Sequence, residues 1–168
     1  MNSLPDAESL LAELVERMRP SVTSQTALIG IHTGGVWIAQ RMHAMLGIAQ
    51  PLGSIDVSFY RDDYQSRGLH AKVRPSAIPF DVIDTDIVLV DDVLHTGRTI
   101  RAAMNEIFDY GRPRSIRLAA LVDRGGRQLP IAAQFVGAEV AVGATDQIEL
   151  TKDGNDKLGL KLNRQGGA

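Results

Sequence analysis

The stretch VLVDDVLHTGRT, residues 88–99, decides the fold and raises the first question about function. An apolar run typical of a buried parallel strand ends on Asp91 and Asp92, and a turn containing Gly97 then leads into a helix expected to begin near Arg98. Neighbouring carboxylates repel each other, so a ligand beyond the strand would explain why both are present. The alternative is that two acidic residues merely end a strand and an ordinary helix cap follows.

The turn in this stretch is suited to hold a phosphate group. The first turn of a helix presents unpaired backbone N–H groups and the positive end of the helix dipole. Gly97 lets the backbone approach a ligand closely, and Thr96 and Thr99 add hydroxyl groups. Carboxylates beside such a turn can accept hydrogen bonds from ribose hydroxyls, and can hold Mg²⁺ directly or through water. The pattern predicts a site for a 5-phosphoribosyl group.

Strand and helix patterns alternate along the rest of the chain. Helical periodicity is found in residues 6–19, 34–46 and 98–110, with glycine caps at Gly47 and Gly111. Strand periodicity is found in residues 26–31, 54–60, 86–91 and 116–122. Met45 and Phe108 are expected on the buried helix faces. The alternation predicts an α/β fold with a central parallel sheet flanked by helices. Ligands in such sheets bind beyond the carboxyl ends of the strands, where residues 30–35 and 91–99 both fall.

The length, the charge and the cysteine count exclude several classes of protein and of site. The 168 residues fit a single domain, 1–168, and the absence of cysteine excludes disulfides, thiolate zinc sites and a cysteine nucleophile. The formal net charge of −2 gives no global reason to expect nucleic acid. No apolar run approaches the roughly 20 residues that span a bilayer, and the chain starts without a signal-peptide pattern. We expect a cytoplasmic protein with no membrane partner.

Several segments resemble one family. The stretch 88–99 resembles the phosphoribosyl diphosphate signature of type I phosphoribosyltransferases. Residues 56–63, 68–81, 102–113 and 118–131 resemble the pyrimidine operon regulator/uracil phosphoribosyltransferase family, and the similarity runs from residue 26 to residue 145. The resemblance implies a type I phosphoribosyltransferase fold with a small hood. It also implies Mg²⁺-dependent transfer of phosphoribosyl from phosphoribosyl diphosphate to uracil, giving UMP and pyrophosphate.

The resemblance assigns roles to individual residues. Asp91 and Asp92 would act on the ribose hydroxyls and Mg²⁺, and the 5′-phosphate loop would consist of Leu94, His95, Thr96, Gly97, Arg98 and Thr99. Pyrophosphate would bind at Ile31, His32, Thr33 and Gly34, with a non-proline cis peptide at Ile31–His32. That segment departs from the family pattern, which often has a basic residue at each of positions 32 and 34. Uracil would bind at Val122, Asp123 and Arg124.

Residues 61–81 show no regular periodicity, and a loop of that length in a compact domain is usually functional or disordered. The resemblance implies a flexible active-site lid, on which Arg61, Lys72 and Arg74 could neutralise pyrophosphate and Asp62 lies at the hinge. A purely structural, solvated loop is the alternative. Residues 163–168 are expected to form a disordered tail.

His95 is a candidate general base. It occupies a loop position where purine-using relatives carry an aspartate proposed for that role and where this subfamily often has tyrosine. Uracil must lose a ring proton to attack, and histidine titrates near neutral pH. The alternative is that His95 only caps or packs against the phosphate loop.

Two further readings of the function stay open. Relatives bind messenger RNA and attenuate pyrimidine operons when UMP is present, so the enzyme could also be a UMP-responsive regulator of pyrimidine biosynthesis. Alternatively, the chain could be an RNA-binding attenuator with little or no catalysis. The basic patch for RNA would consist of Arg112, Arg114, Arg117, Arg124 and Arg127. The other reading is a transferase for a purine or for orotate. A homodimer or higher homo-oligomer is expected, with helix 6–18, Val36 and Trp37 as candidate contacts.

Overall fold

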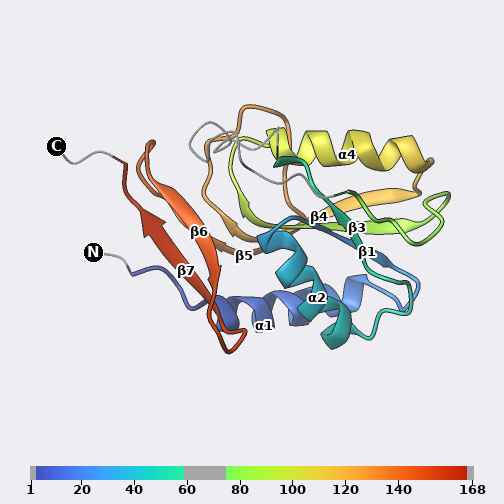
Figure 1. Ribbon diagram of the computed structural model, residues 1–168, viewed down its shortest axis with the longest axis horizontal. Helices are drawn as coiled ribbons and strands as arrows, with labels where there is room; N and C mark the ends of the chain where they lie inside the picture. Colours follow the sequence, from blue (N-terminus) through green and yellow to red (C-terminus); the bar gives the residue numbers. More distant parts are fainter. Residues whose placement is uncertain (1–2, 59–74, 166–168) are drawn as a thin grey trace.

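The computed structural model describes residues 3–58 and 75–165. Within them a five-stranded sheet has the order β2-β1-β3-β4-β5, and every pairing in it is parallel. Its strands are β1 (Ala27–Ile31), β2 (Gly53–Ile55), β3 (Asp86–Leu94), β4 (Ser115–Asp123) and β5 (Phe135–Glu139). Helices α1 (Ala7–Met18) and α2 (Gly34–Leu46) cover one face, and α4 (Arg98–Tyr110) covers the other (Figure 1). This is the α/β fold that the sequence predicts.

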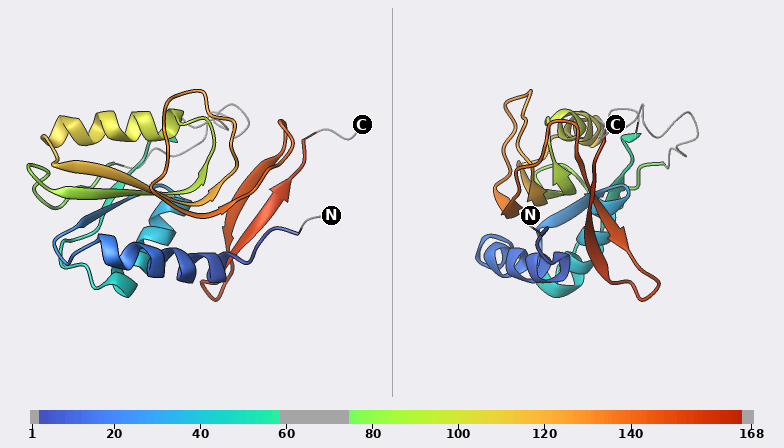
Figure 2. Two further views of the ribbon diagram at one scale, coloured as in Figure 1. Left: turned by 180° about the vertical axis from the view of Figure 1, so that it is seen from behind. Right: turned by 90° about the vertical axis from the view of Figure 1, so that its left-hand side faces the viewer.

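Two smaller elements complete the described chain. A single 3₁₀ turn, η1 (Arg19–Ser21), follows α1. An antiparallel hairpin of β6 (Gln147–Lys152) and β7 (Leu158–Asn163) stands beside the parallel sheet, as both views in Figure 2 show. We call this hairpin the hood. No helix in residues 3–58 and 75–165 is long and apolar enough to cross a membrane.

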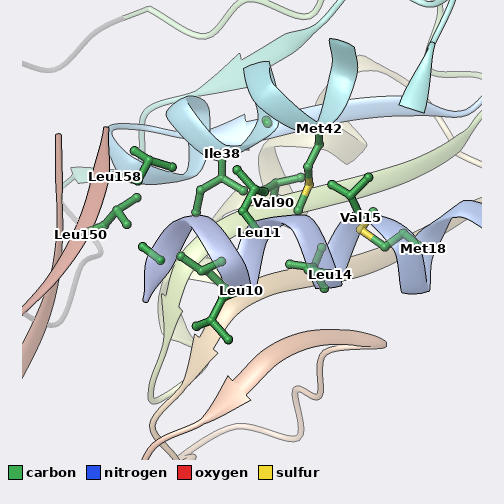
Figure 3. Close-up of a cluster of buried hydrophobic side chains, with 14 of the residues drawn as sticks. Leu10, Leu11, Leu14, Val15, Met18, Ile38, Met42, Val90, Leu150 and Leu158 are labelled. Atoms are coloured by element: carbon green, nitrogen blue, oxygen red, sulfur yellow. The ribbon is translucent and has the colours of Figure 1, made fainter. Parts of the chain in front are cut away.

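Each face of the sheet carries its own apolar layer, because side chains alternate along a strand. Val88 and Val90 of β3 pack with α1 and α2, whereas Ile87 and Leu89 pack with α4. Figure 3 shows the first layer, in which α1 and α2 meet and Leu150 and Leu158 of the hood join them. The hood is thereby attached to the α1–α2 side of the molecule.

The helix predictions are confirmed closely. Helices 34–46 and 98–110 have the expected bounds, and Gly47 ends α2 in the left-handed region with φ 63°. The first helix begins after Asp6, whose Oδ2 accepts a hydrogen bond from the Ser9 N–H at 2.9 Å. Met45 and Phe108 were expected on buried faces and are instead 41% and 56% exposed. Both lie in the last turn of their helices.

Two strand predictions need correction. The strand expected over 54–60 ends at Ile55, because the Asp56 carboxylate accepts the Ser58 N–H at 3.0 Å and forms a local turn. The strand expected over 86–91 continues to Leu94, because its register with β4 extends to the pair Leu94 and Asp123. Asp91 and Asp92 therefore lie within β3 and not at its C-terminal end.

The predicted lid and tail are only partly covered. Residues 59–74 lie outside the described residues, and with them Arg61, Asp62, Lys72 and Arg74. The remaining part of segment 61–81 is tied to β2, since Ser54 and Ala77 exchange two backbone hydrogen bonds of 2.7 and 2.9 Å. The expected tail overlaps β7 at Asn163, and residues 166–168 lie outside the described residues.

Glu8, on α1, connects the hood to α2 as well as to its own helix. Its Oε1 accepts the Leu158 N–H at 2.8 Å, and its Oε2 pairs with Nη2 of Arg41 at 2.5 Å. Arg41 also donates to the carbonyl of Asp156 at 3.4 Å. The Leu158 hydrogen bond, followed by the bond and charge of Arg41, lowers the pKa of Glu8, although burial and the charge of Asp6 oppose the shift.

We expect Glu8→Gln to lower the free energy of unfolding at pH 7 by about 1–2 kcal/mol, because a charged acceptor holds the hood. A lowered pKa in the folded state means that this contribution is complete above the ordinary pKa of 4.5 and is lost as pH falls through the folded value. Urea unfolding at pH 7 and at pH 3 measures both effects. The exposed Glu13→Gln on the same helix is the control, and an equal effect of the two substitutions at pH 7 would contradict this role.

Candidate active site

A cavity of about 580 Å³ opens at the carboxyl edge of the sheet, between the strand ends and the hood. The start of α2, the end of β3, the start of α4 and the loop before β6 all contribute to its wall. Its lining residues are Thr33, Gly34, Trp37, Asp91, Asp92, Val93, His95, Thr99, Arg124, Ala144, Thr145, Asp146, Gln147, Ile148, Glu149, Leu150, Asn163 and Gln165. The structure therefore brings together residues from all three predicted ligand segments, the pyrophosphate, ribose–phosphate and uracil segments.

The acidic pair lies deep in this cavity. Asp91 is 3% exposed and Asp92 is 7% exposed. Each carboxylate accepts the backbone N–H of the following residue, Asp91 from Asp92 at 3.0 Å and Asp92 from Val93 at 2.9 Å. Buried carboxylates are costly unless they are hydrogen-bonded. These bonds hold both side chains in place at the point where the cavity meets β3.

The predicted pyrophosphate segment forms the turn between β1 and α2. Ile31 is fully buried, whereas His32 and Thr33 are half-buried, and Thr33 and Gly34 line the cavity. The cis peptide is at His32–Thr33, one bond later than expected. The His32 N–H donates to the Ile55 carbonyl at 2.9 Å, so hydrogen bonding to the end of β2 continues through His32.

Two glycines allow α2 to begin directly against β3. A Cβ atom on Gly34 would lie 2.3 Å from Oδ2 of Asp92, and one on Gly35 would lie 2.5 Å from the Val90 carbonyl oxygen. The backbone of the α2 start is thus in contact with the acidic pair. An arginine at position 34, which the family often has, could not fit here without moving the Asp92 carboxylate.

The predicted 5′-phosphate loop joins β3 to α4. Gly97 has φ 93° and precedes the first residue of α4, Arg98, so the left-handed conformation that glycine tolerates turns the chain into the helix. Thr96 is buried, and its Oγ1 accepts the Arg98 N–H at 3.3 Å. Leu94 does not face the cavity, since its side chain is buried in the α4 layer. His95 and Thr99 line the cavity.

The predicted uracil segment is divided by the structure. Val122 is fully buried in the core, and the Asp123 carboxylate pairs with Arg127 at 2.5 Å. Arg124 lines the cavity, but its backbone N–H already donates to the Leu94 carbonyl at 3.0 Å. Its guanidinium donates to the carbonyls of Asp146 and Gly143. Arg124 thus connects the end of β4 to the loop that carries the hood.

The resemblance implied a small hood, but the sequence analysis named none of the hood residues that line the cavity, and it interpreted Trp37 as an oligomer contact. Trp37, a candidate oligomer contact, lines the cavity, and Nζ of Lys152 lies 5.0 Å from the centre of its ring. Alternating apolar residues such as Ile148 and Leu150 could have predicted a strand. Nothing local in the sequence indicates that this strand folds back over the acidic pair.

The proposed basic patch is largely engaged within the chain. Arg114 pairs with Asp86 at 3.3 Å, and Arg117 donates to the Ser21 carbonyl at 2.8 Å. Arg124 donates to the Asp146 carbonyl and Arg127 donates to the His95 carbonyl, both in loops beside the cavity. Four of the five arginines therefore have structural partners, and the patch is not a set of unconstrained cations.

The residues present fit Mg²⁺ only in combination with a ligand. No group of three or more histidine or acidic side chains that could hold a metal ion occurs in the part of the chain that the structure describes. Mg²⁺ is commonly bound through one or two carboxylates together with water and substrate phosphates. Asp91 and Asp92 supply that donor set beside two helix starts.

Comparison with known proteins agrees with this geometry. The family model described as "Phosphoribosyl transferase domain" matches residues 1–149. The chain belongs to the phosphoribosyl transferase domain family. A protein named bifunctional protein PyrR from Nitrosococcus oceani is 51% identical over 156 residues, which cover 92% of this chain and 87% of that protein. Another PyrR, from Pseudomonas fluorescens, is 47% identical over 164 residues, covering 95% and 96% of the two chains.

Solved structures place the chain among phosphoribosyltransferases by fold as well. A purine phosphoribosyltransferase from Pyrococcus horikoshii superposes with a TM-score of 0.61 at 27% identity, over 80% of this chain and 82% of that one. A hypoxanthine-guanine phosphoribosyltransferase from Bacillus anthracis gives a TM-score of 0.65 at 18% identity, over 83% and 84%. These structures show the shared fold, whereas the relationship to PyrR proteins rests on the sequence identity.

Proposed function

We propose that the protein is a Mg²⁺-dependent uracil phosphoribosyltransferase of the cytoplasm, which joins uracil to phosphoribosyl diphosphate and gives UMP and pyrophosphate. The observation that carries this proposal is the position of Asp91 and Asp92 between two helix starts in one cavity. Each helix start favours an anion, and the carboxylates favour hydroxyl groups. Phosphoribosyl diphosphate has this order of groups, with a ribose between a 5′-phosphate and a pyrophosphate.

In this mechanism the protein mainly positions the two substrates and neutralises the charge of the leaving pyrophosphate. Thr96, Gly97 and Thr99 hold the 5′-phosphate, and Thr33 and Gly34 hold the pyrophosphate. Asp91 and Asp92 bind the ribose hydroxyls, and their negative charge favours the positive charge that develops on the ribose ring as the bond to pyrophosphate breaks. Mg²⁺, held by these carboxylates, would supply positive charge to the leaving group. Residues 61–81 are proposed to close over the substrates and exclude water.

The choice of uracil rests on the relationship to PyrR proteins and on the wall formed by Arg124 and the loop before the hood. A panel of bases tests it: uracil, orotate, hypoxanthine and guanine are each incubated with phosphoribosyl diphosphate and Mg²⁺, and nucleotide products are separated. We expect UMP as the main product. Turnover of a purine base in preference to uracil would overturn the assignment of the base.

We expect His95→Gln to lower kcat for UMP formation by about a hundredfold and to change the pH–rate profile. Glutamine keeps hydrogen-bonding groups but cannot act as a base. His95 lines the cavity, which puts its ring within reach of a bound substrate, and its Nε2 lies close to Gly126, where an added Cβ would be 2.8 Å away. His43→Gln, at the far end of α2, is the control. A pH profile that His95→Gln leaves unchanged would dismiss the role.

A second function is favoured by the name of the relatives, which are described as bifunctional. We infer that the protein also binds the leader messenger RNA of pyrimidine genes in response to UMP, as a homodimer or higher homo-oligomer. Binding that rests on phosphate contacts should weaken by at least about tenfold between 50 and 200 mM salt. A gel-shift titration with and without UMP measures this effect. Absence of binding at low salt would leave the enzyme as the only function.

A further inference from the structure

Residues 124–131, which follow β4, run alongside the phosphate loop, residues 94–99, and we call them the brace segment. In Figure 2 the chain after β4 rises next to the turn between β3 and α4. Backbone hydrogen bonds join the two segments: the N–H groups of Gln128 and Leu129 both donate to the Thr96 carbonyl, at 2.9 and 3.2 Å. Nε of Arg98 donates to Oε1 of Gln128 at 2.9 Å. The phosphate loop is therefore held from outside as well as by α4.

Arg127 is the central residue of the brace segment. Its Nη1 donates to the His95 carbonyl at 2.6 Å, its Nη2 pairs with Oδ2 of Asp123 at 2.5 Å, and its Nε donates to the Ile131 carbonyl at 2.9 Å. The side chain is only 25% exposed. One guanidinium thus fixes the end of β4, the phosphate loop and the end of the brace segment relative to one another.

These contacts determine the direction of the loop amides. In a trans peptide the carbonyl and the following N–H point in opposite directions. Because Arg127 holds the His95 carbonyl, the Thr96 N–H must point away from the brace segment. The same reasoning applies one residue later, where Gln128 and Leu129 hold the Thr96 carbonyl and turn the Gly97 N–H away. Two successive N–H groups of the phosphate loop are thereby directed to the same side.

We propose that Arg127 is a positioning residue, which aims the Thr96 and Gly97 N–H groups at the 5′-phosphate of the substrate. This inference rests on the proposed function and extends it, since it gives a specific role in phosphate binding to an arginine that the sequence suggested for RNA. Convergent N–H groups bind a phosphate more tightly when their directions are fixed before the ligand arrives, because less ordering is needed on binding. Arg127 provides that fixation without contacting the phosphate itself.

The test compares ligands with and without the phosphate. Backbone amide resonances of Thr96 and Gly97 are followed by NMR during titration with UMP, uridine and inorganic phosphate, in the wild type, Arg127→Gln and Arg127→Lys. We expect both resonances to shift with UMP and with phosphate in the wild type. Arg127→Gln should weaken UMP and phosphate binding by at least about tenfold and leave uridine binding unchanged, and Arg127→Lys should recover part of the loss because lysine keeps the charge but not the fork of donors.

The control is Arg114→Gln, which removes the same charge from the proposed patch at the opposite end of β3, where Arg114 pairs with Asp86. It should bind all three ligands like the wild type. UMP affinity unchanged in Arg127→Gln, or equal losses for UMP and uridine, would overturn the inference, as would wild-type Thr96 and Gly97 amides that ignore phosphate. If Arg127→Gln does not fold, the same comparison is made with Arg127→Lys. Intact phosphate binding without UMP synthesis would overturn the proposed function alone.

Discussion

Replacing Asp91 and Asp92 together by asparagine is expected to lower kcat/KM for UMP formation by at least about a thousandfold, because two preorganised negative charges are removed from the reacting sugar. Asparagine has nearly the same shape, and its carbonyl oxygen can still accept the backbone N–H groups of Asp92 and Val93, to which the carboxylates are bonded. We therefore expect the fold to survive and the loss to appear in the chemistry. Steady-state kinetics with varied phosphoribosyl diphosphate measures it.

Asp86→Asn is a matched control for this experiment. Asp86 begins the same strand, and its carboxylate contacts Arg114 and Ser115 at the edge of the sheet remote from the cavity. Its removal should change kcat/KM by less than about twofold, since an exposed ion pair contributes little. Retention of a tenth or more of wild-type activity in the double variant would show that the acidic pair does not hold the reacting ribose.

The second large effect is expected from Gly35→Ala, which should lower the free energy of unfolding by about 2 kcal/mol or more. The added methyl group would lie 2.5 Å from the Val90 carbonyl oxygen and 3.2 Å from the Asp91 Cα, so it meets the backbone of the central strand and not a flexible side chain. The start of α2 must move away from β3, and the pyrophosphate turn moves with it. Activity should fall together with stability.

Gly154→Ala separates this effect from the general consequence of replacing glycine. Gly154 lies in the turn of the hood, where an added Cβ meets nothing within 4 Å. We expect the free energy of unfolding of Gly154→Ala to stay within about 0.5 kcal/mol of the wild-type value. Urea unfolding of the two variants is the measurement. Equal stability of Gly35→Ala and Gly154→Ala would contradict the close contact between α2 and β3.

The elements that the sequence predicts well are those with local signals. Helix 34–46 lies between a strand and Gly47, and helix 98–110 lies between Gly97 and Gly111, so their periodicity and their caps agree. The acidic pair and its phosphate turn are likewise contiguous in the sequence. The structure places Asp91, Asp92, His95 and Thr99 on one cavity, as the motif indicates.

The features that the sequence does not predict depend on contacts between distant segments. The hood is held partly by Glu8, 150 residues away in the sequence, which accepts the Leu158 N–H. Arg124 and Arg127 look like a surface patch in the sequence, yet they bind carbonyl groups of the loops around the cavity. None of these can be read from the spacing of residue types.

The most direct test of the central claim is the reaction itself. Uracil, phosphoribosyl diphosphate and Mg²⁺ are incubated with the wild-type protein, and UMP and pyrophosphate are quantified in the same samples. We predict that both products appear in equal amounts and that their formation requires Mg²⁺. We also predict that the double variant Asp91→Asn/Asp92→Asn forms neither product. Pyrophosphate without UMP, or no turnover at saturating substrates, would contradict the assignment of this cavity to uracil phosphoribosyl transfer.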